Sequence, residues 1–138
     1  MKNINIQSIQ IIKQLLRVHF VYQLNDKRIA AVTNEERINI FDIYNHYKCD
    51  ITIKPKLKEK IVFICQLDNG DLVTYSNAFV IRLYGITKTS YIQKYGITIK
   101  KSCNITILVS IANNCFVTYD INGHLKIWKG DKSLLFLK

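Results

Sequence analysis

Short apolar runs separated by turn residues recur along the whole chain. The run from Ile61 to Leu67 is almost continuously apolar, and Asp68–Asp71 after it contains a glycine that can adopt positive φ. In Val80–Tyr84, Arg82 alternates with the apolar residues. Such short runs, rich in β-branched and aromatic residues and bounded by turn signals, predict strands. We therefore expect an all-β protein.

Three segments of this pattern align with one another without gaps. In each segment, a closing aromatic residue lies twelve positions after the first apolar residue. The closing aromatic residues, Phe41, Tyr84 and Trp128, are 43 and 44 residues apart. A repeat period of about 40–45 residues is that of a β-propeller blade, which contains four strands. The aligned segments are Ile29–Phe41, Leu72–Tyr84 and Phe116–Trp128.

Each period contains four strand-like runs, which predicts four-stranded antiparallel blades. We expect the inner strands of a blade to be buried on both faces, and the outer strand to be half exposed. The predicted strands are His19–Leu24, Arg28–Val32, Arg37–Phe41 and Asp50–Lys54; then Ile61–Leu67, Leu72–Tyr75, Val80–Tyr84 and Tyr91–Ile99; and finally Ile105–Ile111, Cys115–Tyr119, His124–Trp128 and Leu134–Leu137.

These periods predict a single domain, with blades at residues 18–54, 60–100 and 104–138. Two interpretations of residues 1–17 stay open. The segment Ile9–Lys13 is similar to Ile51–Lys54 and Ile97–Lys100, which indicates the outer strand of a preceding blade. The helical spacing of its apolar residues indicates an amphipathic helix instead. We favour the strand.

The segment Asp120–Trp128 resembles the end of a WD repeat, and residues 76–84 and 33–41 resemble weaker copies. The resemblance covers residues 18–138 and implies an incomplete β-propeller ring that serves as a binding scaffold and not as an enzyme. The family usually places an Asp six residues before the closing aromatic residue, where this chain has Glu35, Ala78 and Asn122. Its Gly-His pair, Gly123-His124, lies in a turn rather than ahead of an inner strand. We therefore expect the repeat's buried His–Ser/Thr–Asp–Trp network to be incomplete.

Three blades leave two open faces, because propellers typically close with about four to eight blades. Open terminal repeats expose apolar strands. The chain is then a piece of a longer propeller, docks on another chain, or joins a second copy as six blades. A fragment with no function of its own is a further possibility.

The chain carries a net charge of +10, which raises the possibility of binding to RNA or anionic lipid. Its lysines are spread along the sequence, however, and the densest runs, Lys54–Lys60 and Lys100–Lys101, fall between the predicted blades. Solvated loops explain these runs better. The charge hypothesis requires these lysines to gather on one face of the molecule.

No known catalytic or metal-binding motif occurs in the sequence. The three histidines, His19, His46 and His124, pair with no Cys or carboxylate at metal-ligand spacing. We therefore predict no enzymatic activity and no cofactor. The four cysteines lie far apart, no run of about 18 apolar residues occurs, and the N-terminus lacks a secretory h-region. These features favour a cytoplasmic protein without a transmembrane segment.

The main functional hypothesis is a protein-interaction scaffold, and binding of RNA or anionic lipid through the lysines between blades is the alternative. We interpret Tyr75, Tyr84, Tyr119 and Trp128 as packing residues between blades rather than as a base-stacking surface. The predicted partner-binding residues lie in loops: Tyr44, His46, Tyr47, Lys56, Lys58, Lys88 and Tyr91.

Overall fold

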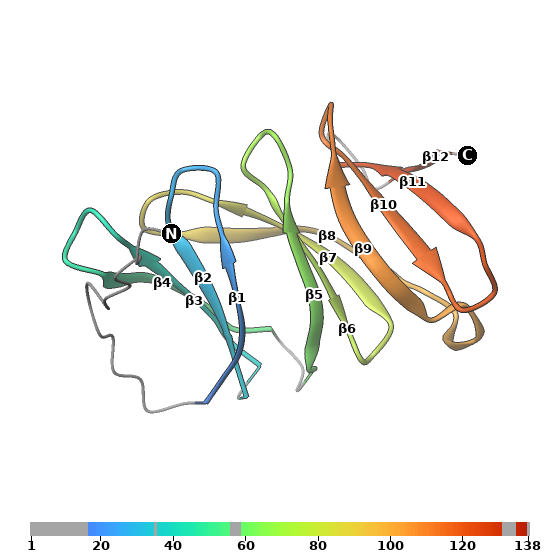
Figure 1. Ribbon diagram of the computed structural model, residues 1–138, viewed down its shortest axis with the longest axis horizontal. Coiled ribbons are helices and arrows are strands. Elements are labelled where there is room, and N and C mark those ends of the chain that lie inside the picture. The colour runs from blue at the N-terminus through green and yellow to red at the C-terminus, as the bar shows by residue number, and fades with distance from the viewer. Residues whose placement is uncertain (1–16, 35, 56–58, 131–134, 138) are drawn as a thin grey trace, which may run out of the picture.

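The computed structural model of this protein describes residues 17–34, 36–55, 59–130 and 135–137. It contains three four-stranded antiparallel sheets that stand side by side as blades (Figure 1). Blade 1 consists of β1 (Val18–Gln23), β2 (Ile29–Thr33), β3 (Ile38–Asp42) and β4 (Lys48–Ile53); blade 2 of β5 (Ile61–Gln66), β6 (Leu72–Ser76), β7 (Val80–Ile86) and β8 (Tyr91–Thr98); and blade 3 of β9 (Ile105–Ile111), β10 (Cys115–Asp120), β11 (Leu125–Lys129) and β12 (Leu135–Leu137).

Within each sheet the strands pair in sequence order, which confirms the predicted all-β fold of three four-stranded antiparallel blades. The blades form an arc that does not close into a ring (Figure 1). The 3-10 turn η1 (Lys101–Cys103) lies between blades 2 and 3. No helix among the described residues is long and apolar enough to cross a membrane.

The turn between the second and third strands has one positive φ and one backbone hydrogen bond in common in all three blades. Its third residue has positive φ: 63° at Glu36, 61° at Phe79 and 82° at Gly123. Each of these residues donates its N–H to the carbonyl oxygen three residues earlier, over 3.0–3.1 Å. Only blade 3 has the glycine that adopts this conformation without strain. The tight turn is therefore a property of the blade and does not depend on a particular residue.

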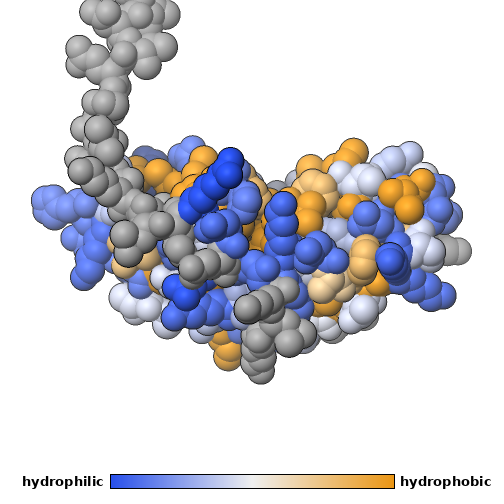
Figure 2. All heavy atoms as spheres, turned by 90° about the horizontal axis from the view of Figure 1, so that it is seen from below, coloured by the Kyte–Doolittle hydropathy of each residue, from blue (hydrophilic) through white to orange (hydrophobic). Residues whose placement is uncertain are grey.

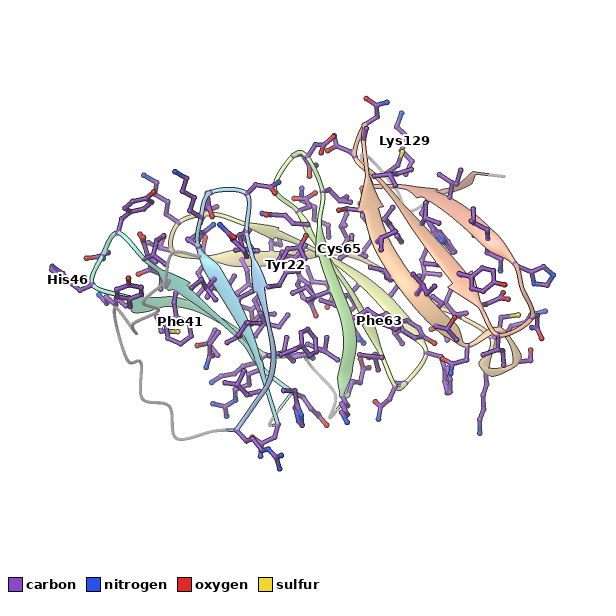
Figure 3. All side chains as sticks on the ribbon, viewed as in Figure 1. Tyr22, Phe41, His46, Phe63, Cys65 and Lys129 are labelled. Carbon is purple, nitrogen blue, oxygen red and sulfur yellow. The ribbon has the colours of Figure 1, made fainter. Side chains whose placement is uncertain are left out.

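The hydrophobic core lies between the blades and forms two clusters. In the first cluster, Val32, Ile40 and Ile53 of blade 1 pack against Leu72 and Tyr84 of blade 2. In the second cluster, which blades 2 and 3 share, the largest buried side chains include those of Tyr75, Leu83, Phe116 and Trp128. Figure 3 shows Tyr22 between β1 and β5, at the first of these junctions. Blade 2 contributes to both clusters, because its two faces contact different neighbours.

How deeply a strand is buried depends on whether a neighbouring blade covers both faces of its sheet, and not only on its order within the blade. The second strands β2 and β6 are the most buried, whereas the innermost strand β1 alternates between half-buried and exposed residues. The expectation that inner strands are buried on both faces is therefore wrong for blade 1, and also for blade 3, whose inner strand β9 exposes Ile107, Val109 and Ile111. Only one face of β1 packs against another blade among the described residues.

The closing aromatic residues of blades 2 and 3 pack as predicted. Tyr84 is 2 % exposed and Trp128 is 6 % exposed. Trp128 stacks on Phe116 at 6.0 Å between ring centroids, and its Nε1–H donates to Thr118 Oγ1 over 2.9 Å. Tyr119, which we also interpreted as a packing residue, is instead 40 % exposed, because no described blade covers that face of blade 3.

The turn between β10 and β11 has a carboxylate, but not at the expected position. Asn122 occupies that position, and Asp120, two residues earlier, accepts the N–H groups of Asn122 and His124 over 2.9 and 3.0 Å. The ring Nδ1 of His124 lies 3.3 Å from Asp120 Oδ2. Desolvation raises the pKa of Asp120, but these donors and the imidazole outweigh it and hold the pKa below its usual range.

Replacing Phe116, which is fully buried, tests the core between blades 2 and 3. Phe116→Ala should lower the free energy of unfolding by about 3–5 kcal/mol, because it removes buried apolar surface and leaves a cavity. The matched substitution at the exposed Ile92 should change it by less than about 0.5 kcal/mol. Urea unfolding followed by circular dichroism measures both. Equal effects of the two substitutions would contradict the assigned core.

Replacing Asp120 by Asn should destabilise the protein more at pH 7 than at pH 3. A carboxyl group whose pKa is lower in the folded state stabilises the fold fully above its unfolded pKa of about 3.9. That contribution is lost as the pH falls through the folded pKa. Urea unfolding of the wild type and of Asp120→Asn at both pH values measures the difference. An equal loss of unfolding free energy at pH 3 and at pH 7 would show that the charge of Asp120 does not stabilise the fold.

Candidate functional site

The turn between β3 and β4 presents aromatic side chains to solvent at the outer tip of blade 1. Tyr44 is 71 % exposed, and its N–H donates to Asp42 Oδ1 over 2.8 Å. His46 and Tyr47 both have positive φ, 53° and 56°, in the left-handed region that non-glycine residues rarely adopt. Figure 3 shows His46 projecting away from the other blades. The three residues that were predicted in this turn therefore share one tightly folded tip, in which Tyr44 and His46 are exposed and Tyr47 is half-buried.

Lys27, from the turn between β1 and β2, extends this tip. Its Nζ lies 6.0 Å from the centroid of the Tyr44 ring, at the outer limit of a cation–π contact. Nothing in the repeat pattern pointed to Lys27, because the contact joins two turns that are separate in sequence. A shallow pocket of about 330 Å³ opens beside this residue. It is lined by Val21, Tyr22, Gln23, Lys27, Ile29 and Ile43.

The turn between β7 and β8 positions the next two predicted residues. Thr87 and Ser90 close the turn through a hydrogen bond from the Thr87 N–H to the Ser90 carbonyl over 2.9 Å, and Lys88 is exposed between them. Tyr91 is only partly available, since its ring packs edge-on against Tyr84 with 6.2 Å between centroids. Tyr91 is thus a packing residue as well as an exposed one.

The remaining predicted residues, Lys56 and Lys58, lie outside the described residues. Of the other predicted residues, Tyr44, His46 and Tyr47 lie in the β3–β4 turn, Lys88 lies in the β7–β8 turn, and Tyr91 is the first residue of β8. Tyr91 of blade 2 also contacts blade 1, because its hydroxyl oxygen accepts the N–H of Lys54 over 3.4 Å. Among the residues that the structure describes, the predicted contacts therefore lie on two hairpins, one in blade 1 and one in blade 2.

Exposed basic residues flank the connections that lead into the blades. We call these residues the basic set; they are Arg17, Lys54, Lys60, Lys100 and Lys101, all exposed. The first strand of each blade begins toward the bottom of Figure 1. Figure 2 views the molecule from that side. Hydrophilic side chains spread across this surface between apolar patches.

Two acidic residues near the basic set point into the protein and not toward solvent. Glu59 is 2 % exposed and forms a two-point ion pair with Arg82, in which Nη2 donates to Oε1 over 2.8 Å. The hydrogen bonding of the Arg82 guanidinium to the Glu59 carboxylate raises the pKa of Arg82, and burial opposes this effect. Asp120, 3 % exposed, is held by its own turn. Glu59 therefore does not offset the charge of the exposed Lys60 at the surface.

The described residues contain no group of three His, Cys, Asp or Glu side chains that could hold a metal ion. Among the cysteines, Cys65 is buried, and burial raises the pKa of its thiol to about 12. A thiol of that pKa is unreactive at neutral pH. The exposed Cys49 lies in β4, where its Sγ contacts the Ile51 carbonyl oxygen at 3.5 Å.

Comparison with solved structures identifies the fold. The protein is similar to the crystal structure of the β-propeller domain of Cps50 (Swd1) from Myceliophteria thermophila, with a TM-score of 0.63 over 85 % of this chain. The two sequences are 17 % identical, and the chain spans 41 % of that structure. No protein-family model matches the sequence, and neither does any curated protein. The three sheets, their inter-blade cores and this likeness together show that the chain has the fold of consecutive β-propeller blades.

Proposed function

We propose that this chain is a non-enzymatic protein-interaction scaffold. The predicted contacts are the exposed turn residues, with the tip of blade 1 as the primary site. One observation carries the proposal: three aromatic or imidazole side chains, Tyr44, His46 and Tyr47, share a tight turn at the end of a paired strand hairpin. Tyrosine is enriched in protein interfaces, and loops held by a rigid scaffold are common binding sites. Lys88 and Tyr91 would extend the contact along blade 2.

Lys27 adds charge selectivity to this primary site. Its ammonium group lies over the Tyr44 ring at the edge of the tip, where a carboxylate of the partner could reach it without displacing the aromatic contact. An acidic peptide with an apolar anchor fits this combination best. The four separate, unpaired cysteines support a reducing compartment such as the cytoplasm for this scaffold.

Binding of RNA or anionic lipid through the basic set is the second candidate function. The observation that favours it is the contrast between exposed lysines and acidic residues turned inward: Lys60 is exposed, whereas its neighbour Glu59 is buried in an ion pair. A surface with few competing carboxylates attracts polyanions and is strongly sensitive to salt.

The scaffold proposal is tested by panning a displayed random-peptide library against the immobilised chain. Enriched peptides should bind Tyr44→Ala about tenfold or more weakly than the wild type, because truncating a tyrosine that anchors an interface costs about 2 kcal/mol or more. Ile121→Ala, which removes an exposed apolar side chain in the turn between β10 and β11, is the control and should bind normally. Peptides that bind Tyr44→Ala as tightly as the wild type would contradict the assigned tip.

The second candidate is tested by the fluorescence anisotropy of a labelled oligo-uridine RNA across a salt series. If Lys60 and Lys100 each neutralise one phosphate, the double substitution to Gln should lower the slope of log K against log salt by about 1.4. Lys88→Gln, at the turn between β7 and β8, should leave the slope unchanged. Binding that is insensitive to salt, or equally affected by Lys88→Gln, would reject the basic set as the binding site.

A further inference from the structure

Blade 3 has an apolar face that no described residue covers. The exposed fractions are 49 % for Ile107, 47 % for Val109, 40 % for Ile111, 40 % for Tyr119 and 62 % for Leu125. These five residues are called the free face of blade 3. The strand register joins them into rows, because Tyr119 of β10 lies opposite both Ile107 of β9 and Leu125 of β11. The surface is therefore continuous across three strands.

The repeat shows what kind of surface fits this face. Every residue of the free face lies 44 positions after a residue that blade 2 turns toward blade 3. On blade 2 these equivalents are buried or half-buried in the second core cluster, against Leu108, Phe116 and Trp128. The equivalents on blade 2 are Phe63, Cys65, Leu67, Tyr75 and Ile81. The same face of an adjacent blade is thus already covered by a blade within this molecule.

Hydrogen bonds accompany the packing of blade 2 on blade 3, and the residue that makes them has an equivalent on the free face of blade 3. The Tyr75 hydroxyl donates to Asn104 Oδ1 over 2.8 Å, at the start of blade 3, and accepts the N–H of Ile105 over 3.4 Å. Tyr119 occupies the position of Tyr75 in blade 3 and is 40 % exposed. A blade seated on the free face would bring its first strand to this hydroxyl.

The opposite end of the arc carries the matching surface. Val21, Gln23 and Ile29 lie 43 positions before Ile64, Gln66 and Leu72, the residues that blade 2 turns toward blade 1. Val21 is 66 % exposed, and Gln23 is exposed beside it. All three residues line the pocket of about 330 Å³ next to β1.

This surface is open mainly along the inner strand of blade 1. Ala31 and Phe41 lie on the same side of the sheet, but they are 3 % and 5 % exposed. The available seat is therefore β1 and the start of β2. The inner strands are also the elements through which blades 2 and 3 contact each other, β5 against β9.

We propose that the free face of blade 3 binds the β1 side of blade 1 in a second copy of this chain, in a head-to-tail arrangement. The chain carries both halves of the contact that its own neighbouring blades make, which is why the occupant is a second copy and not an unrelated surface. One such contact joins two copies into six consecutive blades, within the range of about four to eight blades that close a propeller. The same contact made a second time, between the two remaining open faces, would close the ring. A head-to-tail contact whose rotation closes produces a ring.

The first measurement is the mass of the 138-residue chain by sedimentation and light scattering across a concentration series. The wild type should associate into a dimer of the 16.1 kDa chain. Val109→Lys and Val21→Lys should each give a monomer, because each places a charge in one half of the contact. Ile92→Lys adds the same charge at a 65 % exposed apolar residue outside both surfaces and should leave the dimer intact.

Mixing the two monomeric variants separates the head-to-tail contact from any symmetric one. A Val21→Lys copy retains a normal blade 3, and a Val109→Lys copy retains a normal blade 1, so an equimolar mixture should recover a dimer through one intact contact. Leu125→Lys is the second variant on the free face and should behave as Val109→Lys does. A monomeric wild type, a Val21→Lys variant that stays associated, or a mixture that stays monomeric would overturn the proposal.

Discussion

A blade of this protein is apolar on both faces, and burial of those faces against neighbouring blades is the constraint on which the rest of the structure depends. A single four-stranded sheet cannot bury both of its faces alone. Blade 2 satisfies the requirement on both sides, through Leu72 and Tyr84 toward blade 1 and Tyr75 and Leu83 toward blade 3. Blade 3 satisfies it on one side only, which leaves residues such as Leu125 exposed.

Polar contacts at the blade junctions determine how the blades align. Arg28, 7 % exposed, donates from Nη1 to the Thr87 carbonyl oxygen in the next blade over 2.7 Å. Between blades 2 and 3, the Asn113 N–H donates to Asp68 Oδ2 over 2.9 Å. Apolar faces alone tolerate sliding, whereas the buried guanidinium of Arg28 would lose about 1–3 kcal/mol without its acceptor; the Asn113–Asp68 hydrogen bond is exposed and carries no such penalty. These contacts therefore favour one alignment of the blades and position the turns that carry the proposed binding residues.

Much of the candidate site could be predicted from local sequence, because exposed turns follow directly from the strand pattern. Tyr44, His46 and Lys88 lie in turns as expected. The part that could not be predicted depends on contacts between distant segments. Examples are the packing of Tyr91 on Tyr84 and the approach of Lys27 to Tyr44, which join separate turns.

The sequence by itself determined the strands, the repeat period and the blade architecture, because alternation and turn residues act over a few positions and recur every 43 or 44 residues. Only the tertiary structure decided which face of each blade is covered. Tyr75 and Tyr119 are equivalent in sequence, yet the first is 1 % exposed and the second 40 %. Their difference comes from a neighbouring blade. Likewise, Glu59 lies in a lysine run, and only Arg82 across the sheet accounts for its burial.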